Sequence, residues 1–229
     1  MRRRWYPPED TPSERLTREI LQVASPSKTI LDIGCGRRAS FLRSVSNAFG
    51  TCCGVDPEVH DTSKDGLELL RGSATELPLG DSSVDVVTMI NSIEHLDRPA
   101  DAIRECRRVL RTGGSLFVLA PNKWFGPILL GRLFPHGARV RLNYLLNHRK
   151  TEDTFPAYYR ANTVPELKRL ALACGLVPAT LAYFSADPAY FVFSPLLYRC
   201  WAALERTWLR RDAFAGLSTA ALDSLKMER

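Results

Sequence analysis

One short segment limits the fold of this chain more than any other. The apolar run TILDI, Thr29 to Ile33, is followed by Gly34 and Gly36 and then by a stretch with helical periodicity. Glycines allow a tight turn and let a ligand approach the backbone where a Cβ atom would clash. In open parallel sheets, ligands bind beyond the carboxyl ends of the strands, at turns of this kind. The segment therefore predicts the first strand, turn and helix of an α/β domain with a ligand site at the turn.

The same alternation continues to about residue 122. Strands separated by amphipathic helices favour right-handed crossovers and a mostly parallel sheet with helices on both faces. A further helix is expected at each side of this unit, one capped by Thr11 or Ser13 and one running from the cap Thr163 to Gly175. The other expected strands cover 51–56, 67–72, 84–90, 115–121, 177–184 and 189–194, and the other expected helices cover 40–49, 99–110 and 195–210.

Two carboxylates indicate the kind of nucleotide that binds. Asp56 ends the second strand, at the distance from the turn at which an acidic side chain accepts hydrogen bonds from ribose hydroxyls. The turn with Ala39 also fits a dinucleotide-binding pattern, but Asp32, just before the first glycine, favours another ligand. A buried carboxylate needs a partner, which an amino-acid ammonium group supplies and a pyrophosphate does not.

Four segments carry a family resemblance: ILDIGCG, GVD, GSATELPLGDSSVDVVTMINSIEHL and ECRRVLRTGGSLFVLAPN. In this order they resemble the class I S-adenosylmethionine-dependent methyltransferases, most closely the small-molecule branch similar to the ubiquinone-biosynthesis methyltransferases. The resemblance implies a Rossmann-like α/β sheet of seven strands, mostly parallel with one antiparallel strand, and an insertion after strand 5. It also implies S-adenosyl-L-methionine as the cofactor.

The resemblance further implies which residues bind that cofactor. Asp32, Gly34 and Gly36 would hold the methionine end, Asp56 the ribose, and Asn91 the region of the sulfonium. The adenine would lie against three residues of the neighbouring loops: Pro57, Ser73 and Ala74. The chain departs from the family pattern at Arg38, where a third glycine is usual, and at Ser73, where an aspartate is usual.

His95 is the candidate catalytic residue. Methyl transfer from a sulfonium is an in-line displacement, and a base is needed only when the acceptor is a hydroxyl group. A histidine beside Glu94 at the end of the fourth strand suits that task, although both residues could equally orient the loop. Because His95 can act as a base, we expect O-methylation.

The acceptor is expected to contact the insertion. Tyr158, Tyr159 and Arg160 form its densest polar and aromatic cluster, which would line a pocket and pair with an anionic group or else serve as ordinary lid packing. The predicted acceptor is a small or lipid-linked molecule. No metal site is expected, because the cysteines and histidines lack ligand spacing.

Residues 1–211 are expected to form one domain with three additions. These are an N-terminal helical cap (1–27), the acceptor-side insertion (123–162) and a C-terminal amphipathic helix (194–211); residues 212–229 would be a polar tail. The amphipathic helix could contact a membrane surface peripherally, or pack on the sheet edge or against a second subunit in a homodimer.

Charge and cysteine content restrict the cellular context. The net charge is +6, but the arginines are scattered, which argues against the alternative of an RNA methyltransferase. A non-catalytic protein that binds the cofactor or a membrane is the other alternative. Six cysteines without a CxxC pair favour reduced thiols, and no secretory or transmembrane segment is recognised, so a cytoplasmic location is expected, with or without peripheral membrane contact.

Overall fold

The computed structural model describes residues 11–124, 156–179, 181–184, 194–197, 199–200, 203 and 219–227. The helices expected at 40–49 and 99–110 are present, one between the first two strands and one before the long strand that ends at Ala120, but the strands from residue 51 to residue 90 follow one another without a helix between them. The strands are β1 (Thr29–Ile33), β2 (Thr51–Asp56), β3 (Thr62–Lys64), β4 (Leu67–Arg71), β5 (Val84–Ile90), β6 (Leu110–Ala120), β7 (Leu176–Pro178), β8 (Leu181–Phe184) and β9 (Thr219–Met227). The helices are α2 (Pro12–Val23), α3 (Ser40–Val45), α4 (Pro99–Val109) and α7 (Val164–Ala173), with short 3₁₀ turns at Ser46–Ala48 and Ile93–His95.

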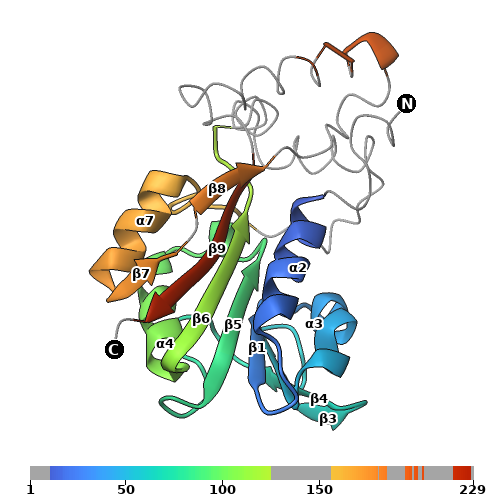
Figure 1. The fold of residues 1–229 in the computed structure, drawn as a ribbon, viewed down its shortest axis with the longest axis vertical. Coiled ribbons are helices and arrows are strands. Elements are labelled where there is room, and N and C mark those ends of the chain that lie inside the picture. Colours follow the sequence, from blue (N-terminus) through green and yellow to red (C-terminus); the bar gives the residue numbers. More distant parts are fainter. Residues whose placement is uncertain are drawn as a thin grey trace.

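The strands form one sheet in the order β3-β4-β2-β1-β5-β6-β9-β7, with β8 also paired to β9. The five neighbouring strands β4, β2, β1, β5 and β6 run parallel to one another. Strand β9 runs antiparallel between β6 and the short strands β7 and β8 (Figure 1). The expected mostly parallel sheet with an antiparallel strand is therefore confirmed. Among the described residues the sheet has nine strands instead of the expected seven, because two short strands share β9 and because β3 is added at the far edge.

The added strand β3 has a local cause. Asp65 and Gly66 join β3 to the antiparallel β4, and both have positive φ angles, of 55° and 75°. An Asp-Gly pair with two positive φ angles is the preferred two-residue turn of a β-hairpin. This dipeptide is the sequence signal for the extra strand.

Residues 219–227 correct one sequence interpretation. They were expected in a polar tail of residues 212–229, but they form β9, with Leu116 opposite Leu225 and Ala120 opposite Ala220. The physical reason is that β6 would otherwise present a long row of unpaired backbone groups at a sheet edge.

Several expected segments lie outside the described residues. These are 1–10 of the helical cap, 125–155 of the insertion, the closing strand at 189–193, and most of the C-terminal helix, of which 195–197, 199–200 and 203 are helical. Among the described residues, no helix is both long and apolar enough to cross a bilayer. The membrane or subunit contact of segment 194–211 stays a prediction.

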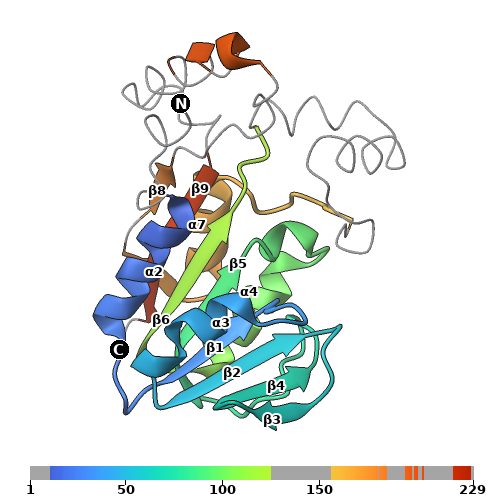
Figure 2. The same ribbon diagram turned by 90° about the vertical axis from the view of Figure 1, so that its right-hand side faces the viewer.

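Helices cover both faces of the sheet, α2 and α3 on one side and α4 and α7 on the other (Figures 1 and 2). Side chains of β1 alternate between the two resulting cores: Ile30 packs with the α2 and α3 side, and Leu31 and Ile33 pack with the α4 and α7 side. Asp32 shares the side of Ile30, because alternate residues of a strand point to the same face. The first helix begins as expected, since the Thr11 side chain accepts a hydrogen bond from Glu14 N.

The loop between β4 and β5 is bound to α4 by several hydrogen bonds, most of them from Arg108. The Arg108 guanidinium pairs with Glu105 and Asp81 and donates to the carbonyl oxygens of Leu77 and Leu79, at 3.1 and 2.7 Å. Glu105 also accepts from Leu77 N at 2.8 Å. These bonds fix the loop that follows the carboxyl end of β4, and so they help to shape the edge of the sheet.

We expect Arg108→Ala to lower the free energy of unfolding by about 1–3 kcal/mol, because it removes several charge-assisted hydrogen bonds, including the one to the Leu79 carbonyl oxygen. Urea denaturation measures this change. The matched control is Arg104→Ala, whose guanidinium pairs with Asp101 at the surface and should contribute less than about 1 kcal/mol. Equal effects of the two substitutions would contradict the role assigned to Arg108.

Candidate active site

The turn after β1 requires glycine. Gly34 has a φ of +77°, and its N–H donates to the carbonyl oxygen of Val55 at 2.8 Å. A Cβ atom at this position would lie 2.5 Å from Ser92 Oγ, so the turn passes directly against the loop after β5. Gly36 also has a positive φ, of +66°, a conformation that other residues adopt only with strain.

Asp56 joins the turn after β1 to the loop after β2. Its Oδ2 accepts from Gly36 N at 2.9 Å, and its Oδ1 accepts from Glu58 N at 2.8 Å. An ion pair of 3.2 Å between Arg37 Nε and Glu58 Oε2 adds a second link between these loops, while Arg38 is exposed. Each carboxylate oxygen can accept a further hydrogen bond, so Asp56 can still bind a hydroxyl group.

Asp32 is a buried carboxylate with one partner. Asp32 is only 3% exposed, and its Oδ1 accepts from Thr88 Oγ1 at 2.7 Å. Burial raises the pKa of Asp32 to about 7, the negative charge of Asp56 adds to this rise, and the Thr88 hydrogen bond opposes it. Oδ2 receives no hydrogen bond from the described residues, and it is not sealed from solvent.

The other residues predicted to bind the cofactor lie on loops at the same edge of the sheet. Pro57 is exposed after β2, and Ser73 and the half-buried Ala74 follow β4. Ser73 Oγ lies 2.9 Å from Thr75 Oγ1 and also accepts from Thr75 N. Asn91 follows β5 with a φ of 52° and donates its N–H to Leu119 O at 2.8 Å. The parallel strands thus bring all of these positions to their carboxyl ends.

The loop after β5 is bound to the segment that returns from the insertion. The carbonyl oxygen of Glu94 accepts from Tyr158 N at 2.7 Å and from Tyr159 N at 3.2 Å. Arg160 pairs with Asp97 at 2.6 Å. The three residues predicted to contact the acceptor therefore lie beside the predicted catalytic loop, although more than 60 residues of chain separate them.

His95 has a defined tautomer in this arrangement. Its Nδ1 lies 2.9 Å from the carbonyl oxygen of Pro156. Because a carbonyl oxygen can only accept, we infer that Nδ1 carries the proton, which makes Nε2 the basic nitrogen of the neutral ring. Nε2 is 4.0 Å from Glu94 Oε1, and the imidazole is about one-third exposed.

The carboxyl group of Glu94 is the second buried acid at this edge. Glu94 is 4% exposed, and burial raises its pKa to about 7. Its Oε2 has no hydrogen-bond partner among the described residues. Near neutral pH this carboxyl group can therefore exist in either protonation state beside His95.

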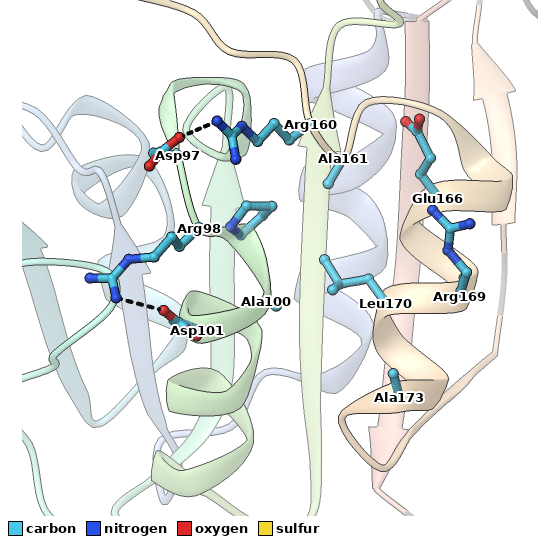
Figure 3. Close-up of a pocket in the computed structure, with 11 residues that line it drawn as sticks. Asp97, Arg98, Ala100, Asp101, Arg160, Ala161, Glu166, Arg169, Leu170 and Ala173 are labelled. Atoms are coloured by element: carbon cyan, nitrogen blue, oxygen red, sulfur yellow. Dashed lines mark ion pairs between the residues drawn. The ribbon is translucent and has the colours of Figure 1, made fainter.

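A groove of about 520 Å³ lies away from Asp32 and Asp56, between the start of α4 and helix α7 (Figure 3). Arg160 stands at its mouth through the ion pair with Asp97, and its guanidinium also lies 5.8 Å from the ring centre of Tyr158. Arg160 is thus already paired within the chain. The other residues that line the groove are Arg98, Pro99, Ala100, Asp101, Ala161, Glu166, Arg169, Leu170 and Ala173.

The sequence analysis missed Thr88 and Ser92. Ser92 Oγ donates to Ile33 O at 2.9 Å and fills the space opposite Gly34, and Thr88 binds Asp32. A signal for Thr88 was present, since it is a hydroxyl residue in the middle of an otherwise strongly apolar strand. Only the pairing of β1 with β5, however, identifies Asp32 as its partner.

The raised pKa of Asp32 predicts how the stability of the ligand-free protein depends on pH. Between about pH 4 and 7 the folded protein keeps a proton on Asp32 that the unfolded chain has released, so this group lowers stability as the pH rises. Asp32→Asn removes that contribution. The stability of the variant relative to the unmutated protein should therefore increase across this window, by up to about 1.4 kcal/mol per pH unit, and then become constant.

Urea denaturation at a series of pH values measures this difference. Glu94→Gln should show a difference of the same sign, because burial raises the pKa of Glu94 as well. A difference for Asp32→Asn that does not vary with pH would show that Asp32 is ionised throughout.

Comparison with known proteins finds similarity to methyltransferases. Residues 31–118 match a family described as a methyltransferase domain. The probable S-adenosylmethionine-dependent methyltransferase Rv3030 of Mycobacterium tuberculosis is 49% identical over 57 residues, 25% of this chain and 21% of that protein. An uncharacterized methyltransferase of Mycobacterium bovis is 34% identical over 133 residues, 53% of this chain and 51% of that protein. The chain thus covers about half, or less, of the length of these relatives.

A solved structure shares the fold over most of the chain. Geranyl diphosphate C-methyltransferase from Streptomyces coelicolor aligns with a TM-score of 0.59 at 18% sequence identity, covering 94% of this chain and 78% of that one. The family match runs from β1 to β6, the part of the chain that contains Asp32, Asp56 and Asn91. Together these findings support a class I S-adenosylmethionine-dependent methyltransferase domain over residues 31–118, the part of the chain that the family match covers.

Proposed function

We propose that this chain transfers the methyl group of S-adenosylmethionine to a hydroxyl group of a small or lipid-linked acceptor. The observation that carries the proposal is the arrangement of Asp32, the turn with Gly34 and Gly36, and Asp56, which accepts from Gly36 N, at one edge of the sheet. It offers one carboxylate for an ammonium group and another for two hydroxyl groups, at the edge where parallel sheets bind nucleotides.

The chemistry of these residues fits the cofactor. The open Oδ2 of Asp32 would accept from the ammonium group of the methionine moiety, and the remaining lone pairs of Asp56 would accept from the ribose hydroxyls. Gly36 leaves the backbone of the turn accessible to the methionine end, because no atom lies within 4 Å of the position that a Cβ atom would take there. Asn91, directly after β5, would flank the same end. The adenine would lie among three residues of the neighbouring loops: Pro57, Ser73 and Ala74.

When bound, the cofactor supplies an electrophilic methyl group whose leaving group departs as a neutral thioether. The protein must therefore position the acceptor oxygen in line and remove its proton. We assign the second task to His95: Nε2 takes the hydroxyl proton, while Nδ1 remains bonded to the carbonyl oxygen of Pro156. The imidazolium that results is stabilised by that carbonyl oxygen and by the nearby Glu94 carboxylate.

The segment from Tyr158 to Arg160 is proposed to contact the acceptor. Tyr158 is 46% exposed and supplies an aromatic surface next to the catalytic loop. Arg160 is paired with Asp97, but both side chains are more than half exposed, so an anionic group of the acceptor could replace Asp97 at small cost. The finer likeness to ubiquinone-biosynthesis methyltransferases and the homodimer also remain proposals.

We expect the protein to bind S-adenosylhomocysteine and not NADH. Asp56→Ala should weaken binding at least tenfold through the lost ribose contacts, and Asp32→Ala should do the same through the lost ammonium contact. Isothermal titration calorimetry measures both. Asp61→Ala is the matched control, because Asp61 is an exposed carboxylate on the neighbouring loop. Tight binding of NADH without a response to S-adenosylhomocysteine would overturn the proposed cofactor.

We expect His95→Ala to slow methyl transfer roughly a hundredfold or more while leaving the affinity for S-adenosylhomocysteine nearly unchanged. Turnover would be followed with radiolabelled S-adenosylmethionine on a library of phenols, quinone precursors, polyketides and lipid-linked sugars. His60→Ala, a change of an exposed histidine, is the control. If turnover of His95→Ala equals that of the unmutated protein, His95 is a loop residue and not a base.

A further inference from the structure

Thr88 is a buried hydroxyl residue at the centre of the sheet. It has no exposed surface, and it lies opposite Asp32 in the parallel pairing of β1 and β5. Its hydroxyl group has one proton to donate, and the contact of 2.7 Å with Asp32 Oδ1 is shorter than the 3.3 Å contact with Leu31 O. A buried hydroxyl is unfavourable without a partner, so the carboxylate and the threonine satisfy each other.

This hydrogen bond determines which oxygen of Asp32 remains available. Oδ1 is occupied by Thr88, whereas Oδ2 has no partner among the described residues and is not sealed from solvent. The donor is fixed in space, because the strand pairing holds the backbone and a β-branched side chain has few rotamers. The orientation of the Asp32 carboxyl group is therefore set by β5, a strand that carries neither the glycine turn nor Asp56.

We propose that Thr88 is a positioning residue for the cofactor, which holds Asp32 so that Oδ2 receives the ammonium group of S-adenosylmethionine. This inference rests on the proposed function. It adds a buried residue on β5 to the proposed cofactor site. It also identifies the structural feature that sets the protonation state of Asp32.

The groups that face Asp32 make its protonation sensitive to Thr88. Asp56 adds negative charge from β2, and burial together with both aspartates raises the pKa of the Cys35 thiol to about 12, so this neighbour is neutral. Thr88 is the group that lowers the pKa of Asp32 against burial and the charge of Asp56. Without its hydroxyl, Asp32 would hold its proton to a higher pH, and a neutral carboxyl group cannot form an ion pair with ammonium.

The test is the affinity for S-adenosylhomocysteine between pH 6 and 9, measured by calorimetry for Thr88→Val and Thr88→Ser. Valine keeps the shape of threonine and removes the hydroxyl, so we expect the pKa of Asp32 to rise by about one unit. The affinity should then be about tenfold lower at pH 6 and about fivefold lower at pH 7, and the loss should shrink towards pH 9. Serine restores the donor and should bind within about threefold of the unmutated protein. Ser115→Ala, which removes a buried hydroxyl on β6, is the matched control and should not change the pH profile.

A second measurement does not depend on the cofactor. In ligand-free protein, the carboxyl carbon signal of labelled Asp32 should titrate about one pH unit higher in Thr88→Val than in the unmutated protein. If valine does not fold at this position, Thr88→Cys, with a weaker donor, should give an intermediate shift. A loss of affinity that is equal at all pH values would show a packing role only and would overturn the inference, as would an unchanged titration.

Failure of the unmutated protein to bind S-adenosylhomocysteine would instead overturn the proposed function, which keeps the two outcomes separate.

Discussion

The central position of β1, paired in parallel with β2 on one side and β5 on the other, is the constraint on which the site depends. Because all three strands run the same way, their carboxyl ends meet at one edge. The turn after β1 can then donate from Gly36 to Asp56 at the end of β2, and Ser92 from the loop after β5 can close against Gly34. A shift of one residue in the pairing of β1 with β5 would place Asp32 and Thr88 on opposite faces of the sheet and separate them.

Two buried carboxyl groups give this edge its electrostatic character. Asp32 and Glu94 are each less than 5% exposed, and burial raises both pKa values to about 7. Such groups lower the stability of the ligand-free fold near neutral pH. Buried carboxyl groups with raised pKa values are typical of sites where a ligand supplies the opposite charge. A cationic ligand group near Asp32, or an imidazolium beside Glu94, would supply the missing partner.

The acceptor side is assembled differently, by contacts between distant parts of the chain. The backbone of Glu94 accepts from the segment after the insertion, and the ring of His95 is oriented by the carbonyl oxygen of Pro156. The orientation of the proposed base therefore depends on a segment more than 60 residues away. The proposed acceptor contacts thus depend on the segment after the insertion, whereas the proposed cofactor contacts depend on the strand ends.

The sequence by itself determined the alternation of strands and helices, the glycine turn and the carboxylates at the ends of β1 and β2, because periodicity and turn chemistry are local. The position of His95 after β5 was also predictable on this ground. Only the tertiary structure decided that residues 219–227 form β9, that Thr88 binds Asp32, and that Arg160 pairs with Asp97. The reason is that strand pairing and ion pairs join residues far apart in the chain, and their partners are selected by burial and open backbone groups that no local pattern encodes.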